Sequence, residues 1–577
     1  MTVDMTSSSL DLRRRPTEAI IASRAVPRQR RTAVDIGAQR FIPIVDLLAL
    51  QILVAAGAVV ALSLGAPGWQ GGAVGLAIAL LLVTPVRGAT LARSVALRWR
   101  YLRDRHRRVD NRQPAEPFDV TASDGAQIGF RWDGRTLLSL IKIDANPQAI
   151  TVLEPGMTVS GEMVPVRLLV DCLRQFDIAL DSIDIVSHGT RSHGHTGVAA
   201  VYDGVLGPLP AIAQRSVWIT IRFDPSRCAE AVRRRDGNRE GILRTATTAT
   251  RRVANRLTEA GLRPRILTAN EIASATNQLS DGADLATVDE SWGTCREGQF
   301  RLCSFAVEPH LLNTAGLGLL WTVPSYSTTV TLSLSEGADN GTIKIRGLAR
   351  FDSDVGVPAH LPGLRHLRGL QFSALACSLP IPRPTRRVGH WSYGWRDPEI
   401  DDLAVPASGC GQVIGADEQG RAVALPLFGP QIDRVEICGT LHLAQQAVLR
   451  SLALGARVLV HSGRPGLWRD MVEMVGRNDL LWVADFNRHA LAAGSDRNYT
   501  VEVFDGVAEQ SVRAGVTCMA VAKPNTPVTP NADVALELIS PEHDTVRVST
   551  RAGSTVVTMI ATDEEMRYIK ASANCIN

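Results

Sequence analysis

The amino-acid sequence predicts a mixed α/β cytoplasmic region anchored by an N-terminal hairpin of two transmembrane helices. Residues 47–86 contain no Asp, Glu, Lys or Arg, which is the pattern of a membrane segment. Residues 434–461 alternate between strand-like, helix-like and strand-like patterns, as in a parallel α/β sheet. Short apolar runs before and after that segment predict many further strands.

The composition excludes several classes of protein. Hydrophobic residues make up 45% of the 577 residues and charged residues 21%, which excludes a wholly disordered or collagen-like chain. The 62 basic and 58 acidic residues give a net charge of only +4, too balanced for a dedicated nucleic-acid binder. The nine cysteines show no CxxC spacing, so we expect neither a disulfide framework nor a zinc site.

The uncharged stretch is long enough for two membrane spans. A helix that crosses the hydrocarbon core needs about 20 residues, and the glycines and proline of residues 65–72 favour a turn in the middle. We therefore predict spans at about 43–64 and 72–91. A signal peptide would have a short apolar core near the N-terminus, whereas about forty residues precede this stretch.

Arginines on both sides of the hairpin predict its orientation. Eight arginines lie between residues 13 and 40 and seven lie between residues 93 and 108, whereas the connecting loop carries no charge. The positive-inside rule then places both termini and the large domain in the cytoplasm. Asp46 and Arg87 bracket the hairpin, and two interpretations stay open: an ion pair, or separate contacts with water and lipid headgroups.

The chain divides into six predicted parts. A basic, disordered tail at 1–42 precedes the transmembrane hairpin at 43–92, and a basic juxtamembrane helix and linker follow at 93–117. The remaining parts are an α/β region at 118–385, a second α/β part with the strand–helix–strand unit at 386–505, and a strand-rich extension at 506–577. Within the α/β region, Asp133 and Gly134 predict a β-hairpin turn, and apolar residues predict an amphipathic helix around 242–257.

Two glycine-containing loops partly resemble the loops that bind nucleotides. A P-loop has the pattern GxxxxGK[ST] after a strand, but at residues 439–446 the second glycine is replaced by Ala444 and the lysine by Gln445. The sequence therefore argues against ATP hydrolysis at this point. Residues 409–415 have the third glycine of a dinucleotide loop one residue late, so we interpret them as a turn.

Two other patterns could bind a metal ion. Asp352 and Asp354 form a DxD triplet, in which two carboxylates can share a divalent ion. His188, His193 and His195 lie in a polar loop without a carboxylate or cysteine that would complete a metal site. Solvated loops are the simpler interpretation of both, so we predict no catalytic, cofactor-binding or metal-binding residues. The alternative is a membrane-anchored, glycosyltransferase-like enzyme that uses a metal and a nucleotide sugar at the DxD triplet.

The sequence between about 40 and 505 resembles the EccE family, a core membrane component of ESX-type (type VII) secretion systems. The similarity is best at residues 215–227, which read RSVWITIRFDPSR, and at residues 233–236, which read RRRD. A helix with RVANRL at residues 252–257, followed by Gly261, also looks like the family, as does the segment 408–427.

The resemblance implies a non-enzymatic structural subunit of an inner-membrane complex that exports small helical proteins. It implies EccB, EccC and EccD as partners, with EccC as the ATPase, and contact with membrane lipids. It also implies a cytoplasmic fold distantly similar to a degraded glycosyltransferase, without a cofactor, a small-molecule substrate or a nucleic-acid partner.

Overall fold

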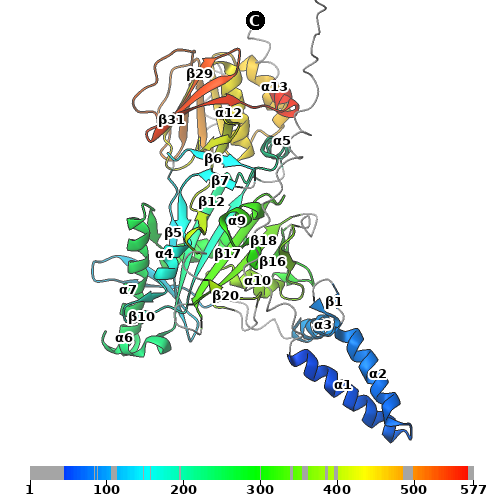
Figure 1. Cartoon of the computed structure of the whole chain (residues 1–577). Helices are drawn as coiled ribbons and strands as arrows, with labels where there is room; N and C mark the ends of the chain where they lie inside the picture. The colour runs from blue at the N-terminus through cyan, green and yellow to red at the C-terminus, as the bar shows by residue number, and fades with distance from the viewer. Residues whose placement is uncertain are drawn as a thin grey trace, which may run out of the picture. The chain divides into compact units, whose positions relative to one another are not determined.

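The computed structural model describes most of the chain, which forms two compact units, residues 1–96 and 97–577 (Figure 1). The residues that it describes are 44–83, 85–86, 89–105, 114–146, 148–155, 157–193, 196–298, 300–337, 342–353, 361–383, 388–395, 400–484 and 498–569. The predicted tail at 1–42 lies outside them, as does Arg87 of the Asp46–Arg87 alternative.

The first unit contains the predicted helical hairpin. Helix α1 (Ile44–Ser63) and helix α2 (Gly68–Val83) lie side by side (Figure 1), and Gly57 contacts Gly71 so closely that a Cβ on Gly71 would lie 2.0 Å from the Gly57 oxygen. Strands β1 (Pro85–Val86) and β2 (Ala89–Thr90) follow. Within the described part of the chain, no helix combines the length and the apolarity needed to cross a membrane.

Helix α3 (Leu91–Arg105) falls in the segment predicted to be a basic juxtamembrane helix. Its second half belongs to the second unit, where Tyr101 is buried and its hydroxyl donates to the main-chain oxygen of Glu290 at 2.7 Å. The Tyr101 ring meets Trp292 edge-on, with 5.6 Å between the ring centres, and Arg98 lies over the same indole. These contacts attach the end of α3 to the first large sheet.

The first large sheet is antiparallel throughout. Its main path follows the order β14-β15-β16-β18-β17-β11-β12-β5-β4-β3, and β13, β19 and β20 pair at its sides. The turn between β4 and β5 contains Gly134 with a φ of 89°, so the predicted hairpin at Asp133 and Gly134 is confirmed. The strands are β3 (Phe118–Thr121), β4 (Gln127–Trp132), β5 (Leu137–Ile143), β11 (Ser182–Thr190), β12 (Gln214–Phe223), β13 (Pro264–Ile266), β14 (Asp289–Glu290), β15 (Cys295–Glu297), β16 (Phe300–Val307), β17 (Ser327–Glu336), β18 (Ile343–Asp352), β19 (Leu364–His366) and β20 (Ser392–Trp395).

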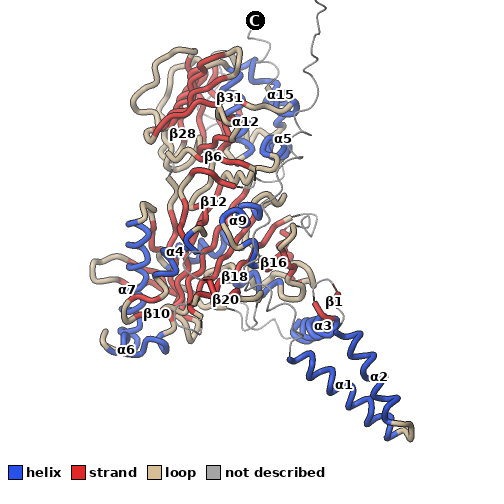
Figure 2. Tube along the Cα trace, in the orientation of Figure 1, coloured by secondary structure: helices blue, strands red, loops and turns tan. Residues whose placement is uncertain are grey.

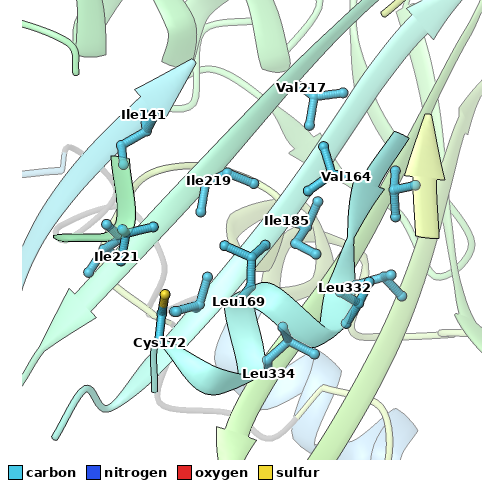
Figure 3. Close-up of a cluster of buried hydrophobic side chains, with 14 of the residues drawn as sticks. Ile141, Val164, Leu169, Cys172, Ile185, Val217, Ile219, Ile221, Leu332 and Leu334 are labelled. Carbon is cyan, nitrogen blue, oxygen red and sulfur yellow. The ribbon is translucent and has the colours of Figure 1, made fainter. Parts of the chain in front are cut away.

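Helices cover both faces of the first sheet. On one face, Leu169 of α4 (Val166–Asp171) lies among Ile185 and Ile219 (Figure 3), and the buried stripe of α7 (Asn238–Glu259) completes this core. The predicted amphipathic helix is therefore confirmed. The other face packs under α8 (Ala269–Leu279), which begins with a capping box, and under α10 (Gln371–Cys377). Further elements at this sheet are α6 (Ala229–Arg233), α9 (Thr314–Leu320), the pair β9 (Arg174–Gln175) and β10 (Ile178–Ala179), and the pair β8 (Met163–Pro165) and β21 (Ala404–Pro406).

The second large sheet is half parallel and half antiparallel, in the order β26-β25-β27-β28-β24-β29-β30-β31-β22-β23-β6-β7. Neighbouring strands from β26 to β29 run parallel, and those from β29 to β7 run antiparallel. The strands are β6 (Thr151–Glu154), β7 (Met157–Ser160), β22 (Gln412–Ala416), β23 (Ala422–Leu425), β24 (Arg434–Cys438), β25 (Val458–Ser462), β26 (Leu481–Ala484), β27 (Val501–Asp505), β28 (Thr517–Ala522), β29 (Val534–Ser540), β30 (Thr545–Thr550) and β31 (Gly553–Met559).

The strand order does not follow the predicted boundaries at 385/386 and 505/506. Strand β28, from the segment predicted to be an extension, lies between β27 and β24 in the middle of the parallel half. Strands β6 and β7, from the segment predicted to belong to the first α/β region, form the far edge of the second sheet. The physical reason is that backbone hydrogen bonds join strands distant in sequence, whereas hydrophobic periodicity reports only local structure.

Helix α12 (Leu441–Ala453) is the core of the second part of the fold. It links β24 to β25 as predicted, and nearly all its residues are buried, because the sheet covers one side and α5 (Gly197–Leu206) packs on it. Figure 2 shows α5, α12 and α15 (Asp563–Tyr568) together beside the strands of this sheet, and α13 (Arg469–Val475) contacts α15. Arg450 of α12 forms a buried ion pair with Glu565 of α15 at 2.7 Å and also donates to the carbonyl oxygens of Val413 and Ile414.

We expect the Arg450→Ala variant to lower the free energy of unfolding by about 3–5 kcal/mol, because the buried Glu565 carboxylate would lose its cation. Thermal unfolding of the full-length protein, followed by circular dichroism, measures the change. The matched control is Arg244→Ala, which removes two exposed ion pairs, with Asp236 and Glu240, and should leave the transition almost unchanged. A wild-type transition in Arg450→Ala would show that the pair does not hold α15 in place.

Candidate functional site

The loop where a P-loop would lie is too short for one. Strand β24 ends at Cys438 and α12 begins at Leu441, so only Gly439 and Thr440 connect them. The other six positions of the eight-residue pattern, 441–446, already lie in the helix. The Gly439 amide donates to the Ala522 carbonyl at 3.0 Å, and the Thr440 side chain caps α12. The Gln445 side chain, at the position of the P-loop lysine, donates to the main-chain oxygen of Leu467. These polar groups are bound within the fold.

A buried carboxylate lies at the carboxyl end of the neighbouring parallel strands. Asp505 is the last residue of β27 and is fully buried. It accepts hydrogen bonds from the Ser462 hydroxyl at 2.7 Å, the Trp468 indole at 3.0 Å and Arg464 Nη2 at 2.7 Å. Ser462 ends β25, and Trp468 lies in the short helix Pro465–Trp468. Ligands of open α/β sheets bind at this edge, so Asp505 marks the strongest candidate site of the second sheet.

Arg464 determines what this candidate site can do. Burial by itself would raise the pKa of Asp505, but hydrogen bonds from Arg464, Trp468 and Ser462 outweigh burial and hold the pKa below its usual range. In P-loop hydrolases an aspartate of this kind helps to hold Mg²⁺. Here the guanidinium of Arg464 binds the carboxylate instead. The arrangement pairs the buried carboxylate with a half-exposed guanidinium of the chain itself and ties the end of β27 to the segment that follows β25.

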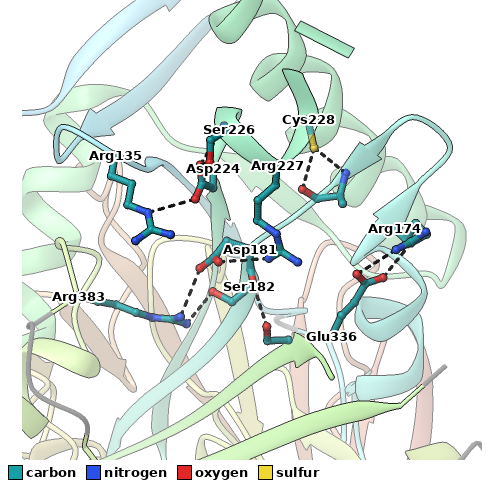
Figure 4. A network of polar contacts seen from close by, with 12 residues as sticks. Arg135, Arg174, Asp181, Ser182, Asp224, Ser226, Arg227, Cys228, Glu336 and Arg383 are labelled. Atoms are coloured by element: carbon teal, nitrogen blue, oxygen red, sulfur yellow. Dashed lines mark hydrogen bonds and ion pairs between the residues drawn. The ribbon is translucent and has the colours of Figure 1, made fainter. Parts of the chain in front are cut away.

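The first sheet carries a second polar cluster, which we call the arginine layer: Arg131, Arg222, Arg346, Arg350 and Arg383. Its guanidinium groups donate to the segment that follows α10, at the oxygen atoms of Ser378 Oγ and of the main chain of Pro380, Ile381 and Val388. Asp184 binds two members of the layer, Arg222 and Arg383, both at 2.8 Å. Figure 4 shows Arg383 in contact with Asp181 and with the Ser182 hydroxyl at the start of β11. The layer therefore fixes residues 378–381 and Val388 to the sheet.

The charges of the arginine layer fit a structural role. Burial alone would raise the pKa of Asp184, but Arg383 and Arg222 hold it below its usual range. Burial lowers the pKa of Arg131 to about 10, so this side chain stays charged at neutral pH. The described polar contacts of the layer are with carboxylates, hydroxyls and main-chain oxygens of this chain. The layer therefore holds the main chain of Pro380, Ile381 and Val388 in position.

The structure gives the predicted DxD residue Asp352 a structural contact. Asp352 is the last residue of β18, and its carboxylate accepts the main-chain N–H of Arg301 at 2.9 Å, which ties β18 to the start of β16. Asp354 lies outside the described residues. Among the described ranges, no group of three or more His, Cys, Asp or Glu side chains could hold a metal ion.

The structure separates the two described histidines of the predicted loop. His188 lies in β11, where Nδ1 is 2.9 Å from the Thr329 hydroxyl and Nε2 is 3.4 Å from Asp281. Burial lowers the pKa of His188. His193 instead contacts the end of α12, where its main-chain N–H donates to Ala453. His195 lies outside the described residues.

The structure contains a close cysteine–histidine pair that the sequence analysis did not predict. Cys303 Sγ lies 3.2 Å from His366 Nε2, which is the distance of an activated thiol nucleophile. Burial raises the pKa of Cys303 to about 12, so the thiol stays protonated at neutral pH. The pair is therefore not poised for nucleophilic catalysis.

One cavity of about 310 Å³ lies near the start of β25, at the small end of the range of ligand pockets. The ion pair between Arg477 and Asp479 forms part of its wall, which gives it a polar lining. The lining residues are His193, Thr196, Leu452, Gly455, Arg457, Arg477, Asp479 and Leu480.

Residues 211–307, from the start of β12 to the end of β16, match a family model described as "Putative type VII ESX secretion system translocon, EccE". The match contains three of the segments that carry the resemblance, residues 215–227, 233–236 and 252–257. The fold and this match define a component of a type VII secretion system.

Individual relatives agree with the family match. The chain is 30% identical over 301 residues to the ESX-5 secretion system protein EccE5 of Mycobacterium tuberculosis, covering 48% of the chain and 70% of that relative. It belongs to the EccE family, as the sequence resemblance predicted. It is also 30% identical over 273 residues to EccE5 of Mycobacterium marinum, where it spans 65% of the relative, just under two thirds. It is 25% identical to the ESX-1 protein EccE1 of Mycolicibacterium smegmatis over 68% of the chain and 76% of that relative.

We expect Asp505 to contribute to stability at neutral pH and to lose this contribution in acid. The folded pKa lies below that of the unfolded chain, about 4, so the contribution is complete above that value and disappears as pH falls through the folded pKa. The melting temperature of the full-length protein, measured between about pH 7 and 2, should therefore fall less steeply in Asp505→Asn than in wild type. The control variant is Glu542→Gln, at an exposed position. Parallel curves for wild type and Asp505→Asn would contradict this expectation.

Proposed function

We propose that this chain is a non-enzymatic structural subunit of the inner-membrane core complex of a type VII secretion system. In this role it assembles with EccB, EccC and EccD and supports the export of small helical proteins. The match of residues 211–307 to the EccE family carries the proposal. Three relatives that are named as ESX secretion system proteins support it.

The helical hairpin supplies the membrane anchor in this proposal. Gly57, Gly71 and Gly75 let α1 and α2 approach closely, because a Cβ at any of them would lie within 2.5 Å of a backbone oxygen of the other helix. Small residues of this kind allow close packing of helices in membranes. Arginines before and after residues 43–92 keep both termini and the large domain on the cytoplasmic side.

The polar clusters support a role as scaffold. Asp505 is bound by Arg464, and Asp352 is bound by the main chain of Arg301, so both carboxylates already have fixed partners within the fold. The two sheets of the second unit are joined by main-chain hydrogen bonds, including those from Cys410 to Ile212 and from Gly411 to Ala213. A rigid domain of this kind offers stable surfaces for neighbouring subunits.

The test is a mild-detergent purification of the tagged full-length protein from cells that express the whole secretion system. We expect the protein to migrate on a native gel in a large assembly that contains an FtsK-like ATPase. Removing seven residues from either predicted span, which leaves about 15 in the first or about 13 in the second, should abolish this co-purification because the segment no longer crosses the membrane. A matched control removes seven residues from the tail at 1–42. A normal assembly with a shortened span would contradict the anchoring role, and a free monomer in wild type would contradict the proposed function.

A further inference from the structure

Phe176 has the most exposed large hydrophobic side chain in the described part of the chain, with 92% of its surface accessible. It is the first of the two residues that connect β9 and β10. Its φ of 57° lies in the left-handed region, where glycine and asparagine are favoured and a bulky side chain is rare. A phenylalanine therefore serves neither burial nor turn geometry at this position. An exposed aromatic ring in a strained turn points to an interaction surface.

Neighbouring side chains hold the turn in place. The guanidinium carbon of Arg252, on α7, lies 5.2 Å from the centre of the Phe176 ring, and the same side chain donates to the main-chain oxygen of Gln175 at 3.2 Å. Asp177, the second turn residue, accepts two hydrogen bonds from Arg235 at 2.8 and 3.2 Å. The turn is thus fixed to α7 and to the end of α6. A group that is already ordered loses less entropy when it binds a partner.

The helices beside this turn are strongly basic. Residues 225–263, which contain α6 and α7, carry ten arginines and four acidic residues, a net charge of +6. The whole chain has a net charge of +4, so the other residues together are slightly acidic. Positive charge is therefore concentrated in the segment that contains α6 and α7, and Arg252 of this segment lies over the Phe176 ring. This distribution fits a partner whose surface is acidic.

We propose that the β9–β10 turn and the basic helices α6 and α7 form a docking surface for an acidic protein that receives the Phe176 ring in an apolar pocket. Aromatic residues and arginine are the residues that most often dominate protein–protein interfaces. Carboxylates alternate with the arginines here, as in the pairs Glu230–Arg233 at 2.6 Å and Glu240–Arg244 at 3.0 Å. A protein partner can match both signs, whereas an anionic lipid surface would repel the carboxylates. The inference rests on the proposed function, since it names a surface that would hold a neighbouring subunit.

The first experiment places the photoreactive amino acid p-benzoylphenylalanine at position 176 of the full-length chain in cells that express the secretion system. We expect irradiation to give one adduct with a protein subunit, at a site that mass spectrometry finds beside Asp or Glu residues. The control carries the same probe at Met474, a half-exposed position on α13, and should not give this adduct. An adduct with lipid, or the absence of an adduct specific to position 176, would overturn the inference.

The second experiment uses the Phe176→Gly variant, which separates binding from folding. Glycine suits the φ of this turn, so the melting temperature should be no lower than that of wild type. We expect the variant to retain at least tenfold less of the cross-linked subunit in a detergent pull-down. Val556→Ala, at another exposed apolar position, is the matched control. Equal retention by Phe176→Gly and wild type would overturn the inference and leave the proposed function standing. If wild type purifies alone, the proposed function fails and the cross-linking result decides the inference.

Discussion

Buried guanidinium groups must donate their hydrogen bonds within the protein, and this constraint organises both large sheets. On the first sheet the arginine layer binds the main chain of Pro380, Ile381 and Val388, so these residues lie fixed against the strands. In the second part of the fold, Arg450 joins the helix α12 to β22 and to α15. In each case one charged side chain binds several segments that are far apart in the sequence. Burial of a charge is costly unless such partners are present, so the arginines specify where these segments lie.

These contacts also support the proposed role as a scaffold. The positions at which a metal or a phosphate would be expected are bound by groups of the same chain: Asp505 by Arg464, Asp352 by the amide of Arg301, and Gly439 by Ala522. The match to the EccE family covers β12, α6, α7 and the strands that follow. That segment lies in the first sheet, and it carries the basic helices whose surface charge distinguishes them from the rest of the chain.

Local features were predictable from the sequence, whereas pairing between distant segments was not. The turn at Gly134, the buried face of α7 and the β24–α12–β25 unit all follow from periodicity and turn residues, and the structure has them. The insertion of β28 between β27 and β24 left no local pattern, because it depends on hydrogen bonds between strands. Asp505 was missed although a signal existed: an apolar strand, VEVF, ends in an aspartate. Its partner Arg464 lies 41 residues away and could not be assigned without the fold.

The ion pair of Arg464 with Asp505 means that the cation beside this carboxylate is part of the chain itself. A bound magnesium ion or nucleotide exchanges with the cell, so a domain that depends on one changes with the cell's energy supply. A guanidinium that belongs to the chain cannot be exchanged, and its charge does not vary with metabolism. The Asp505 carboxylate therefore has its counter-charge wherever the chain is folded. The contact between the end of β27 and the segment from Ser462 to Trp468 is set by the chain's own sequence.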